Sequence, residues 1–435
     1  MRETAEVVGL THDGQGIVRA GKTVFVAGAL PGETVSFERT RKHRQHDDGK
    51  LLEVVRPAAE RVTPRCAHFG VCGGCALQHL APEAQVTMKE QELRDNLERV
   101  GHVEYRAWLP ALRGPAWGYR RRARLGAKFV PKKGKVVVGF RERLAPYVAD
   151  VTRCEVLAEP IGALVHALGQ LLGTLDIHQH VPQIEVAVAD NTTALVLRVL
   201  KPPGTEDCAK LRDFAAHHAL RLYLQSGGLD SIAELTVGDA AAAPLNYALP
   251  AFDLTLDFAP TDFVQVNGAV NQALVGRAVE LLRPSAQSRV LDLYCGLGNF
   301  TLALARTAGH VVGVEGEAGL VERARHNARC NGLANVEFHA SDLSKPTEPP
   351  EGWLRGRYTH VLLDPPRVGA APEMLAAIGR LAPERVLYVS CHPGSLARDL
   401  GILVHEHGFT LEAAGVVDMF PHTAHLESMA LLERP

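Results

Sequence analysis

The sequence predicts a multidomain protein with an N-terminal β-barrel, a central α+β domain and a C-terminal α/β domain built on a doubly wound, Rossmann-like sheet. Three observations predict this fold class. The first 60 residues lack helical periodicity, residues 61–80 are rich in cysteine and glycine, and strand and helix patterns alternate from about residue 262. A length of 435 residues fits about three domains of ordinary size. We therefore expect domains at 1–60, 61–258 and 259–435.

Short strands separated by turns are predicted for residues 1–60. Closely spaced glycines interrupt apolar pairs such as Ile17-Val18, and strands of this length close into small barrels. A basic cluster that includes Arg39, Arg41 and Lys42 follows them. The segment therefore indicates a small barrel with a basic margin.

The central range 61–258 combines a cysteine-rich stretch with mixed strand and helix patterns. A helix over 82–100, ended by Gly101, is expected to pack on the C-terminal domain, and another helix is expected near 158–173. From residue 101 to residue 153 there are 13 Lys or Arg and 3 Asp or Glu, although the whole chain carries a net charge of −2. This local charge indicates a polyanion site, and a solvated face explains it equally well.

Five buried parallel strands are predicted in the C-terminal range, at 290–294, 311–315, 336–340, 361–364 and 386–390. Helices are predicted near 268–283, 299–307, 317–331 and 372–382. This alternation is typical of a doubly wound sheet, whose ligands bind at the carboxyl ends of the strands. The functional residues are therefore expected at these ends.

A glycine turn follows the first of these strands. Gly296 and Gly298 let the backbone pass close to a ligand, and Glu315 ends the next strand, where an acid hydrogen-bonds ribose hydroxyls. Asn299 and Phe300 replace the further glycine that would cradle a pyrophosphate. The turn therefore favours S-adenosylmethionine over NAD.

Polar side chains follow three other strands. Asp342 follows the third strand, where it either reaches an adenine or caps a helix. Two prolines after Asp364 force an extended backbone that projects Asp364 and Arg367 into the crevice. Cys391 stands at the tip of the last predicted strand, and Pro393 is expected to prevent a strand or helix from continuing directly.

A cysteine at the tip of a strand, like Cys391, can serve as a nucleophile. Methylation of pyrimidine carbon 5 needs a thiolate that adds to carbon 6 and a separate base that removes the proton from carbon 5. Cys391 and the C-terminal Glu427 meet these two needs. Otherwise, a strand-end cysteine is a small buried apolar residue.

Five motifs of the C-terminal half resemble those of the RNA uracil-5-methyltransferases. They are Phe263-Val-Gln-Val-Asn267, Asp292-Leu-Tyr-Cys-Gly-Leu-Gly-Asn299, Asp364-Pro-Pro-Arg367, Ser390-Cys-His-Pro393 and Asp418-Met-Phe-Pro-His-Thr-Ala-His-Leu-Glu427. The resemblance implies Cys391 as nucleophile and Glu427 as base. It implies cofactor contacts by Gln265, Tyr294, Asn299, Glu315, Asp342 and Asp364. The sequence departs from the family at His392, where an asparagine is usual.

The N-terminal half is also similar to members of this family. Residues 1–60 look like a TRAM domain, a small RNA-binding barrel. Four cysteines resemble the iron–sulfur ligands of the ribosomal RNA members, namely Cys66, Cys72, Cys75 and Cys154. The resemblance implies a [4Fe–4S] cluster and 23S ribosomal RNA as the partner.

The spacing of the four cysteines alone fits zinc or a [4Fe–4S] cluster. The predicted role of the cluster is to hold an RNA-binding surface in shape, including the basic segments between Cys75 and Cys154. The remaining Cys208, Cys295 and Cys330 are expected to be packing residues.

Two other functions stay open. One is a transfer RNA uracil-5-methyltransferase, although transfer RNA members typically lack the TRAM-like segment and the four cysteines. The other is a non-catalytic iron–sulfur RNA-binding protein, which would have no need of Cys391 and Glu427. The sequence shows neither an apolar signal segment nor a run of membrane-spanning length, so we expect a cytoplasmic monomer without a membrane partner.

Overall fold

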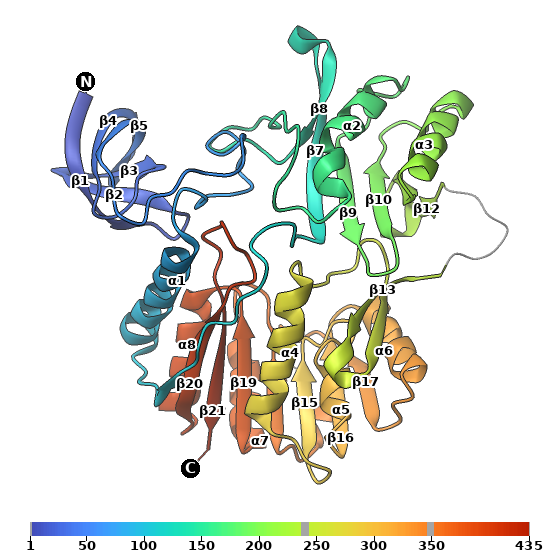
Figure 1. Ribbon diagram of the computed structural model, residues 1–435. Helices are drawn as coiled ribbons and strands as arrows, with labels where there is room; N and C mark the ends of the chain where they lie inside the picture. Colours follow the sequence, from blue (N-terminus) through green and yellow to red (C-terminus); the bar gives the residue numbers. More distant parts are fainter. Residues whose placement is uncertain (1, 236–242, 346–351, 435) are drawn as a thin grey trace.

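The computed structural model describes residues 2–235, 243–345 and 352–434. Figure 1 shows a barrel at the upper left, a second sheet with helices at the upper right, and a large α/β domain below them. The predicted N-terminal barrel and the predicted doubly wound C-terminal sheet are both confirmed. No helix of the described residues is both long and apolar enough to span a membrane.

The N-terminal barrel consists of β1 (Arg2–Leu10), β2 (Gln15–Ala20), β3 (Lys22–Ala27), β4 (Thr34–Lys42) and β5 (His46–Arg56). It closes in the order β1-β2-β3-β5-β4, and only the β3–β5 pair is parallel. Gly21, with φ of +70°, turns the chain between β2 and β3 without a Cβ penalty. Its core contains Val7, Val18, Val24, Val26, Ala29, Val35 and Phe37.

The central sheet has the order β12-β11-β10-β9-β7-β8. Its strands are β7 (Arg122–Val130), β8 (Lys135–Gly139), β9 (Gln183–Val188), β10 (Thr193–Arg198), β11 (Leu220–Gln225) and β12 (Ile232–Glu234). Helices α2 (Ile161–Gly173) and α3 (Thr205–His217) pack on β8 and β11 respectively. Two 3-10 turns, η2 (Pro131–Lys133) and η3 (Leu229–Ser231), complete this part. The helix expected near 158–173 is therefore present as α2.

The C-terminal sheet has the order β17-β16-β15-β18-β19-β21-β20-β6. Its strands are β6 (Ala107–Trp108), β15 (Arg289–Leu293), β16 (His310–Glu315), β17 (Val336–Ala340), β18 (His360–Leu363), β19 (Arg385–Ser390), β20 (Thr410–Val417) and β21 (Glu427–Glu433). The first five strands in this order are parallel, and β21 is antiparallel to both neighbours. The bounds of the five predicted strands differ from these by no more than one residue.

Helices cover both faces of this sheet. They are α4 (Gly268–Leu282), α5 (Thr301–Ala305), α6 (Ala318–Cys330), α7 (Pro372–Leu381) and α8 (Pro393–His405), with the 3-10 turn η5 (Gly352–Arg355). Neighbouring residues of β19 alternate between two buried clusters, with Leu387 and Val389 in one and Val386 and Tyr388 in the other. Burial on both faces explains why the strands read as continuous apolar runs in the sequence.

Pro393 is the first residue of α8, so the prediction that it prevents a helix from continuing directly was wrong. At the first helical position a proline loses no hydrogen bond, because that N–H has no partner within the helix. His392 is the N-cap of α8, and its ring accepts from the backbone N–H of Ser395. The chain therefore passes from the tip of β19 into α8 within three residues.

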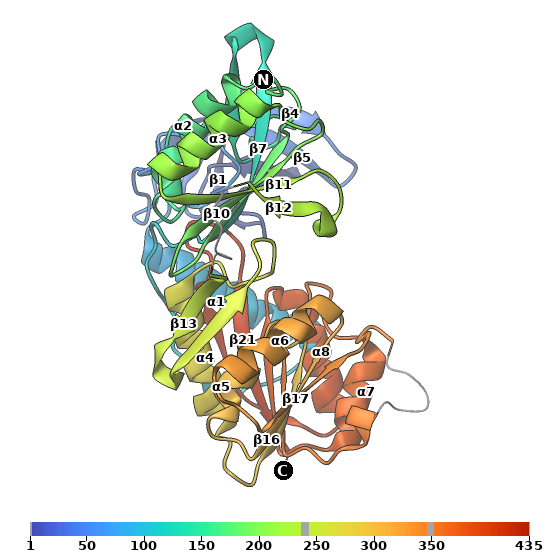
Figure 2. The same cartoon turned by 90° about the vertical axis from the view of Figure 1, so that its right-hand side faces the viewer.

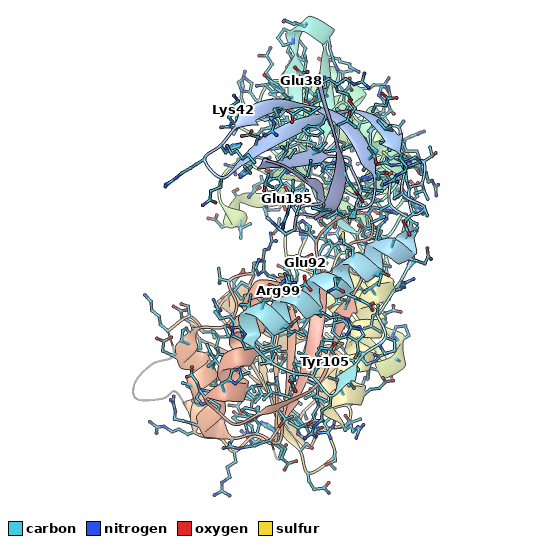
Figure 3. All side chains as sticks on the ribbon, turned by 90° about the vertical axis from the view of Figure 1, so that its left-hand side faces the viewer. Glu38, Lys42, Glu92, Arg99, Tyr105 and Glu185 are labelled. Carbon is cyan, nitrogen blue, oxygen red and sulfur yellow. The ribbon has the colours of Figure 1, made fainter. Side chains whose placement is uncertain are left out.

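Helix α1 (Pro82–Asn96) continues as the π-helical turn η1 (Leu97–Gly101). Figure 3 shows both, marked by Glu92 and Arg99, crossing the C-terminal domain beneath the barrel. The helix packs against β20 and α8, and the guanidinium of Arg94 lies 3.6 Å from the ring centroid of Trp108 in β6. Residues 82–108 therefore extend the C-terminal domain, although they lie within the range 61–258.

A two-stranded hairpin of β13 (Leu245–Leu249) and β14 (Leu254–Phe258), joined by η4 (Pro250–Phe252), stands apart from both large sheets. It packs against α4 and α6 at the junction of the central and C-terminal domains (Figures 1 and 2). Its buried leucines share one apolar cluster with α4 and α5. The C-terminal domain thus begins structurally before residue 259.

Candidate active site

The register of β19 and β21 brings Cys391 and Glu427 to one place. Ser390 pairs with Ser428 across the two antiparallel strands, and the Ser428 hydroxyl donates to the Ser390 carbonyl at 3.1 Å. One step further along the same register, Cys391 stands opposite Glu427. Both serines are buried, so this edge is fixed by backbone pairing inside the domain.

Acidic groups surround the Cys391 thiol. Burial, followed by the charges of Glu427 and Asp364, raises the pKa of Cys391 to about 11, although the charge of Arg367 acts to lower it. The pKa of Glu427, a residue only 3% exposed, is raised well above its ordinary value by burial and then by Asp364. Burial raises the pKa of Asp364 to about 7. Two such neighbouring acids retain a proton near neutral pH.

His392 takes part in the fold beside Cys391. Its Nδ1 accepts from the Ser395 backbone N–H at 3.1 Å, and the Ser395 hydroxyl donates to the Arg367 carbonyl at 3.0 Å. Burial lowers the pKa of His392, and so does the charge of Arg367, which keeps the ring neutral and able to accept. A neutral histidine therefore performs the capping that an asparagine side chain also provides.

Helix α1 holds the loop that leads to Glu427. The Lys89 ammonium, which is fully buried, donates to Asp418 Oδ1 at 2.7 Å and to the Phe420 carbonyl at 3.0 Å. Gln85 Oε1 accepts from the His422 backbone N–H at 2.8 Å. Sequence reasoning missed both residues, because buried polar positions on a helix become visible only when their partner loop is known.

The cysteine-rich segment holds the other side of the same loop. The backbone N–H groups of Ala76 and Leu77 both donate to the His422 carbonyl at 2.9 Å. The Trp117 ring stacks on His422 with 3.9 Å between centroids, and the Tyr119 hydroxyl donates to the Pro421 carbonyl. Burial lowers the pKa of His422 to about 4, so its ring is neutral and serves as a packing element.

Glu315 joins the ends of β15 and β16. Its carboxylate accepts from the backbone N–H of Gly296 at 3.1 Å and of Glu317 at 3.0 Å. Gly296 and Gly298 have φ of +56° and +99°, and the neighbouring Tyr294 also has a positive φ of +63°. The turn is therefore built as predicted, with Glu315 and Tyr294 at its margins.

Asn299 and Gln265 lie on the side of this turn that faces α4. The Asn299 amide exchanges two hydrogen bonds with the amide of Asn271, at 2.9 and 3.0 Å, and accepts from the Tyr247 hydroxyl at 2.9 Å. Gln265, Tyr247 and Asn271 line one small pocket. Asn299 thus fastens the turn to α4 and to the hairpin β13–β14.

Asp342 is exposed and caps its own turn, since Oδ1 accepts from the backbone N–H and hydroxyl of Ser344 at 3.0 and 2.6 Å. Ser344 and Tyr294 line a cavity of about 340 Å³ that Gly369 and Asp399 border on the far side. Asp342 therefore lies beside a concave space next to the glycine turn.

The four predicted metal-binding cysteines line one pocket. Cys154 is buried, and Cys66, Cys72 and Cys75 are half-buried. Burial, together with the neighbouring thiols, raises the pKa of Cys72 to about 11 and that of Cys75 to about 12. Among the remaining cysteines, Cys295 is buried and Cys208 is half-buried, but Cys330 is exposed. The prediction that Cys330 is a packing residue was wrong.

The fold and the site define a class: a methyltransferase with a Rossmann-like catalytic domain. A family model described as tRNA (uracil-5-)-methyltransferase matches residues 251–435. The solved structure of Pyrococcus abyssi tRNA (uracil-54, C5)-methyltransferase in complex with S-adenosyl-L-homocysteine is similar with a TM-score of 0.74 and 22% identity. This similarity covers 99% of this chain and 100% of that chain, so the fold is shared throughout.

Proteins of similar sequence identify the family within this class of methyltransferases. The chain is 49% identical to the 23S rRNA (uracil(1939)-C(5))-methyltransferase RlmD of Methylococcus capsulatus, over 99% of this chain and 96% of the relative. It is 50% identical to the RlmD of Alkalilimnicola ehrlichii, over 98% of this chain and 96% of the relative. The chain belongs to the RlmD family of RNA uracil-C5-methyltransferases.

Proposed function

We propose that this protein transfers the methyl group of S-adenosylmethionine to carbon 5 of a uridine in 23S ribosomal RNA, forming 5-methyluridine. The observation that carries the proposal is the register that pairs Ser390 of β19 with Ser428 of β21, next to Cys391 and Glu427, in a chain 49% identical to an RlmD enzyme over nearly its whole length. The names of these relatives specify uracil 1939 of 23S rRNA, and we propose the equivalent uridine as the target here.

In the proposed mechanism, the Cys391 thiolate adds to carbon 6 of the uracil and makes carbon 5 enolate-like. Carbon 5 then attacks the methyl group, and S-adenosylhomocysteine leaves. Glu427 takes the proton from carbon 5, and the bond between sulfur and carbon 6 breaks. The positive charge of Arg367 favours the thiolate, and burial makes an ionised Glu427 a stronger base than an exposed carboxylate.

We propose that the methyl donor lies along the carboxyl ends of β15, β16 and β17. Its contacts in this proposal are Gln265, Tyr294, Asn299, Glu315, Asp342 and Asp364. Support comes from the tightly turned glycine segment, whose Gly296 N–H donates to a carboxylate oxygen of Glu315. The cavity beside Tyr294 gives space for an adenosine at the same end of the sheet.

We propose that Cys66, Cys72, Cys75 and Cys154 hold a [4Fe–4S] cluster. Among the described residues, there are two groups in which the ligand atoms of three side chains all lie within 4.8 Å of one another. Neither group contains any of these four thiols, so no three of the four sulfur atoms are this close together. A single tetrahedral zinc ion would require sulfur atoms about 3.8 Å apart, whereas the thiolates of a cluster bind different irons and stay farther apart. Four thiols in one pocket, one of them buried and three half-buried, also fit a group that carries positive charge.

When bound, the cluster supplies fixed attachment points for four thiolates. The segment after Cys75 donates two hydrogen bonds to His422, so the ligand loop also positions the loop that leads to Glu427. We further propose that the barrel is a TRAM domain that contacts RNA, with the basic end of β4, at Arg41 and Lys42, on phosphates. A monomeric state stays a prediction.

The test is a methylation assay with the purified protein, S-adenosylmethionine and two RNAs, a 23S ribosomal RNA transcript and a pool of transfer RNAs. We expect 5-methyluridine at one position of the 23S transcript, located by mass mapping of nuclease fragments. Methylation of transfer RNA in its place would establish the alternative substrate. A protein that binds 23S RNA but transfers no methyl group to either RNA would contradict the proposed activity.

A further inference from the structure

A histidine, a cysteine and an aspartate converge on the outer side of the C-terminal domain, where α6 covers β16 and β17. His326 and Cys330 are one helical turn apart on α6, and Asp257 belongs to β14. His326 Nε2 lies 3.0 Å from Asp257 Oδ2 and 3.5 Å from Cys330 Sγ. The three ligand atoms all lie within 4.8 Å of one another.

These separations are close to those around a tetrahedral zinc ion. With zinc bonds of about 2.0 Å to nitrogen and 2.3 Å to sulfur, the two ligand atoms stand about 3.5 Å apart. The distance between His326 Nε2 and Cys330 Sγ equals this value, but Sγ also lies 4.0 Å from Nδ1, so the imidazole must rotate before Nε2 points at an ion shared with the thiol. The Asp257 oxygen is at hydrogen-bond distance from the imidazole, so a small rotation of this partly exposed carboxylate opens the third position.

An ion pair between His326 and Asp257 does not by itself explain why a thiol lies beside the imidazole. The side chains of His326 and Asp257 are 46% and 20% exposed, and pairs this accessible contribute little to stability. Such a pair does not require a thiol 3.5 Å from the imidazole. Cys330 is exposed, so an ion reaches all three side chains from solvent.

Hydrogen bonds from two asparagines hold α6, which carries His326 and Cys330, against β14, which carries Asp257. Asn327 donates to the carbonyls of Asp257 and Leu297 at 3.1 Å, and its Oδ1 accepts from the Asp257 N–H at 2.9 Å. Asn331 exchanges hydrogen bonds of 2.9 and 2.7 Å with the backbone of Thr255. Helix α6 and strand β14 are therefore fixed against each other, which pre-organises the ligands they carry.

We propose that Asp257, His326 and Cys330 bind one divalent cation of zinc character, with water at the fourth position. On binding, the S–H proton of Cys330 passes to the buffer and a bond forms between sulfur and the metal. The cation fastens the hairpin β13–β14 to α6. Because Tyr247 of this hairpin donates to Asn299, the metal stabilises a contact of the glycine turn.

The test measures alkylation of Cys330 in the holoprotein by iodoacetamide, with and without an excess of Zn²⁺, by mass spectrometry of the Cys330 peptide. The readout is specific to Cys330, and the excess keeps the set of His43, His46 and Asp48 from depleting the ion. We expect Zn²⁺ to slow the alkylation about tenfold or more, since a metal-bound thiolate is shielded.

The protection should be lost in His326→Ala and weakened in Asp257→Asn. The matched control, His339→Ala, removes an imidazole from the neighbouring β17 and should keep it. Equal alkylation rates with and without Zn²⁺ would overturn the proposal. Undiminished protection in His326→Ala would overturn it as well, because the thiol would then bind the metal without its proposed partner.

Discussion

The catalytic edge at Cys391 and the pocket of four cysteines both contain thiols whose pKa is raised by burial, to about 11 for Cys391 and about 12 for Cys75. They differ in what holds them. Cys391 meets Glu427 through the register of two paired strands. The four cysteines of the pocket come from a loop before α1 and a loop before α2, and the neighbouring thiols raise the pKa of Cys75. Backbone pairing thus fixes the edge beside Cys391, whereas in our proposal a bound cluster holds the four cysteines together.

The largest expected effect is that of Cys391→Ala. Loss of the nucleophile should reduce turnover by about 10⁴-fold or more, because no other group replaces a covalent step. RNA affinity should stay within about twofold, since phosphate contacts supply most of it. Single-turnover methylation and filter binding measure the two quantities, and Cys208→Ser is the control. Substantial turnover in Cys391→Ala would remove the covalent mechanism.

Glu427→Gln should slow product release by about 10³-fold, because an amide keeps the shape of the carboxylate but accepts no proton. Methylated RNA linked to Cys391 should accumulate and survive a denaturing gel. The control is His425→Gln, which changes another titratable side chain of the loop, at an exposed position. Free product at the normal rate in Glu427→Gln would assign the proton transfer to another base.

Lys89→Met tests whether α1 positions the catalytic loop. Removing the buried ammonium leaves Asp418 without its partner, which should lower the free energy of unfolding by about 3 kcal/mol. Urea unfolding measures it, and kcat should fall more than the affinity for RNA. The double variant Lys89→Met with Asp418→Leu should recover most of the stability. A stability equal to that of the wild type in Lys89→Met would show that the pair does not hold the loop.

Serine at Cys66, Cys72, Cys75 or Cys154 should remove the iron and lower RNA methylation by about tenfold or more, because ligand loss unfolds the surrounding segment. Binding of S-adenosylmethionine, measured by calorimetry, should persist, since the glycine turn lies in the other domain. Cys208→Ser should keep about four irons. Anaerobically purified wild-type protein with one zinc and no iron would contradict the cluster.

The smallest expected effect concerns pH. The thiolate of Cys391 is the reactive form, and with a pKa of about 11 its fraction rises with pH throughout the neutral range. Adduct formation should therefore accelerate up to about tenfold per pH unit. Arg367→Met removes the charge that lowers this pKa, so its adduct formation should be a few-fold slower at pH 7, by stopped-flow measurement. A rate independent of pH would show that another step limits the reaction.

The strands of the C-terminal sheet could be predicted from the sequence, but the partners of its buried side chains could not. Strands β15–β19 were predicted within one residue because buried parallel strands read as apolar runs bounded by turns. The approach of Glu427 to Cys391 depends on β21 entering antiparallel between β19 and β20, which no spacing reveals. Buried Lys89 could not be predicted because its partner loop is remote in sequence, and the exposure of Cys330 could not be predicted because it depends on how α6 packs.

The most direct test of the central claim is the identity of the residue that binds the uracil. Wild-type protein, S-adenosylmethionine and a 23S ribosomal RNA fragment with 5-fluorouridine at the target position are incubated, digested and analysed by mass spectrometry. Fluorine does not leave carbon 5 as a cation, so the adduct should persist. The expected result is one methylated base linked to the peptide that contains Cys391. An adduct on another residue, or none while ordinary RNA is methylated, would contradict the account.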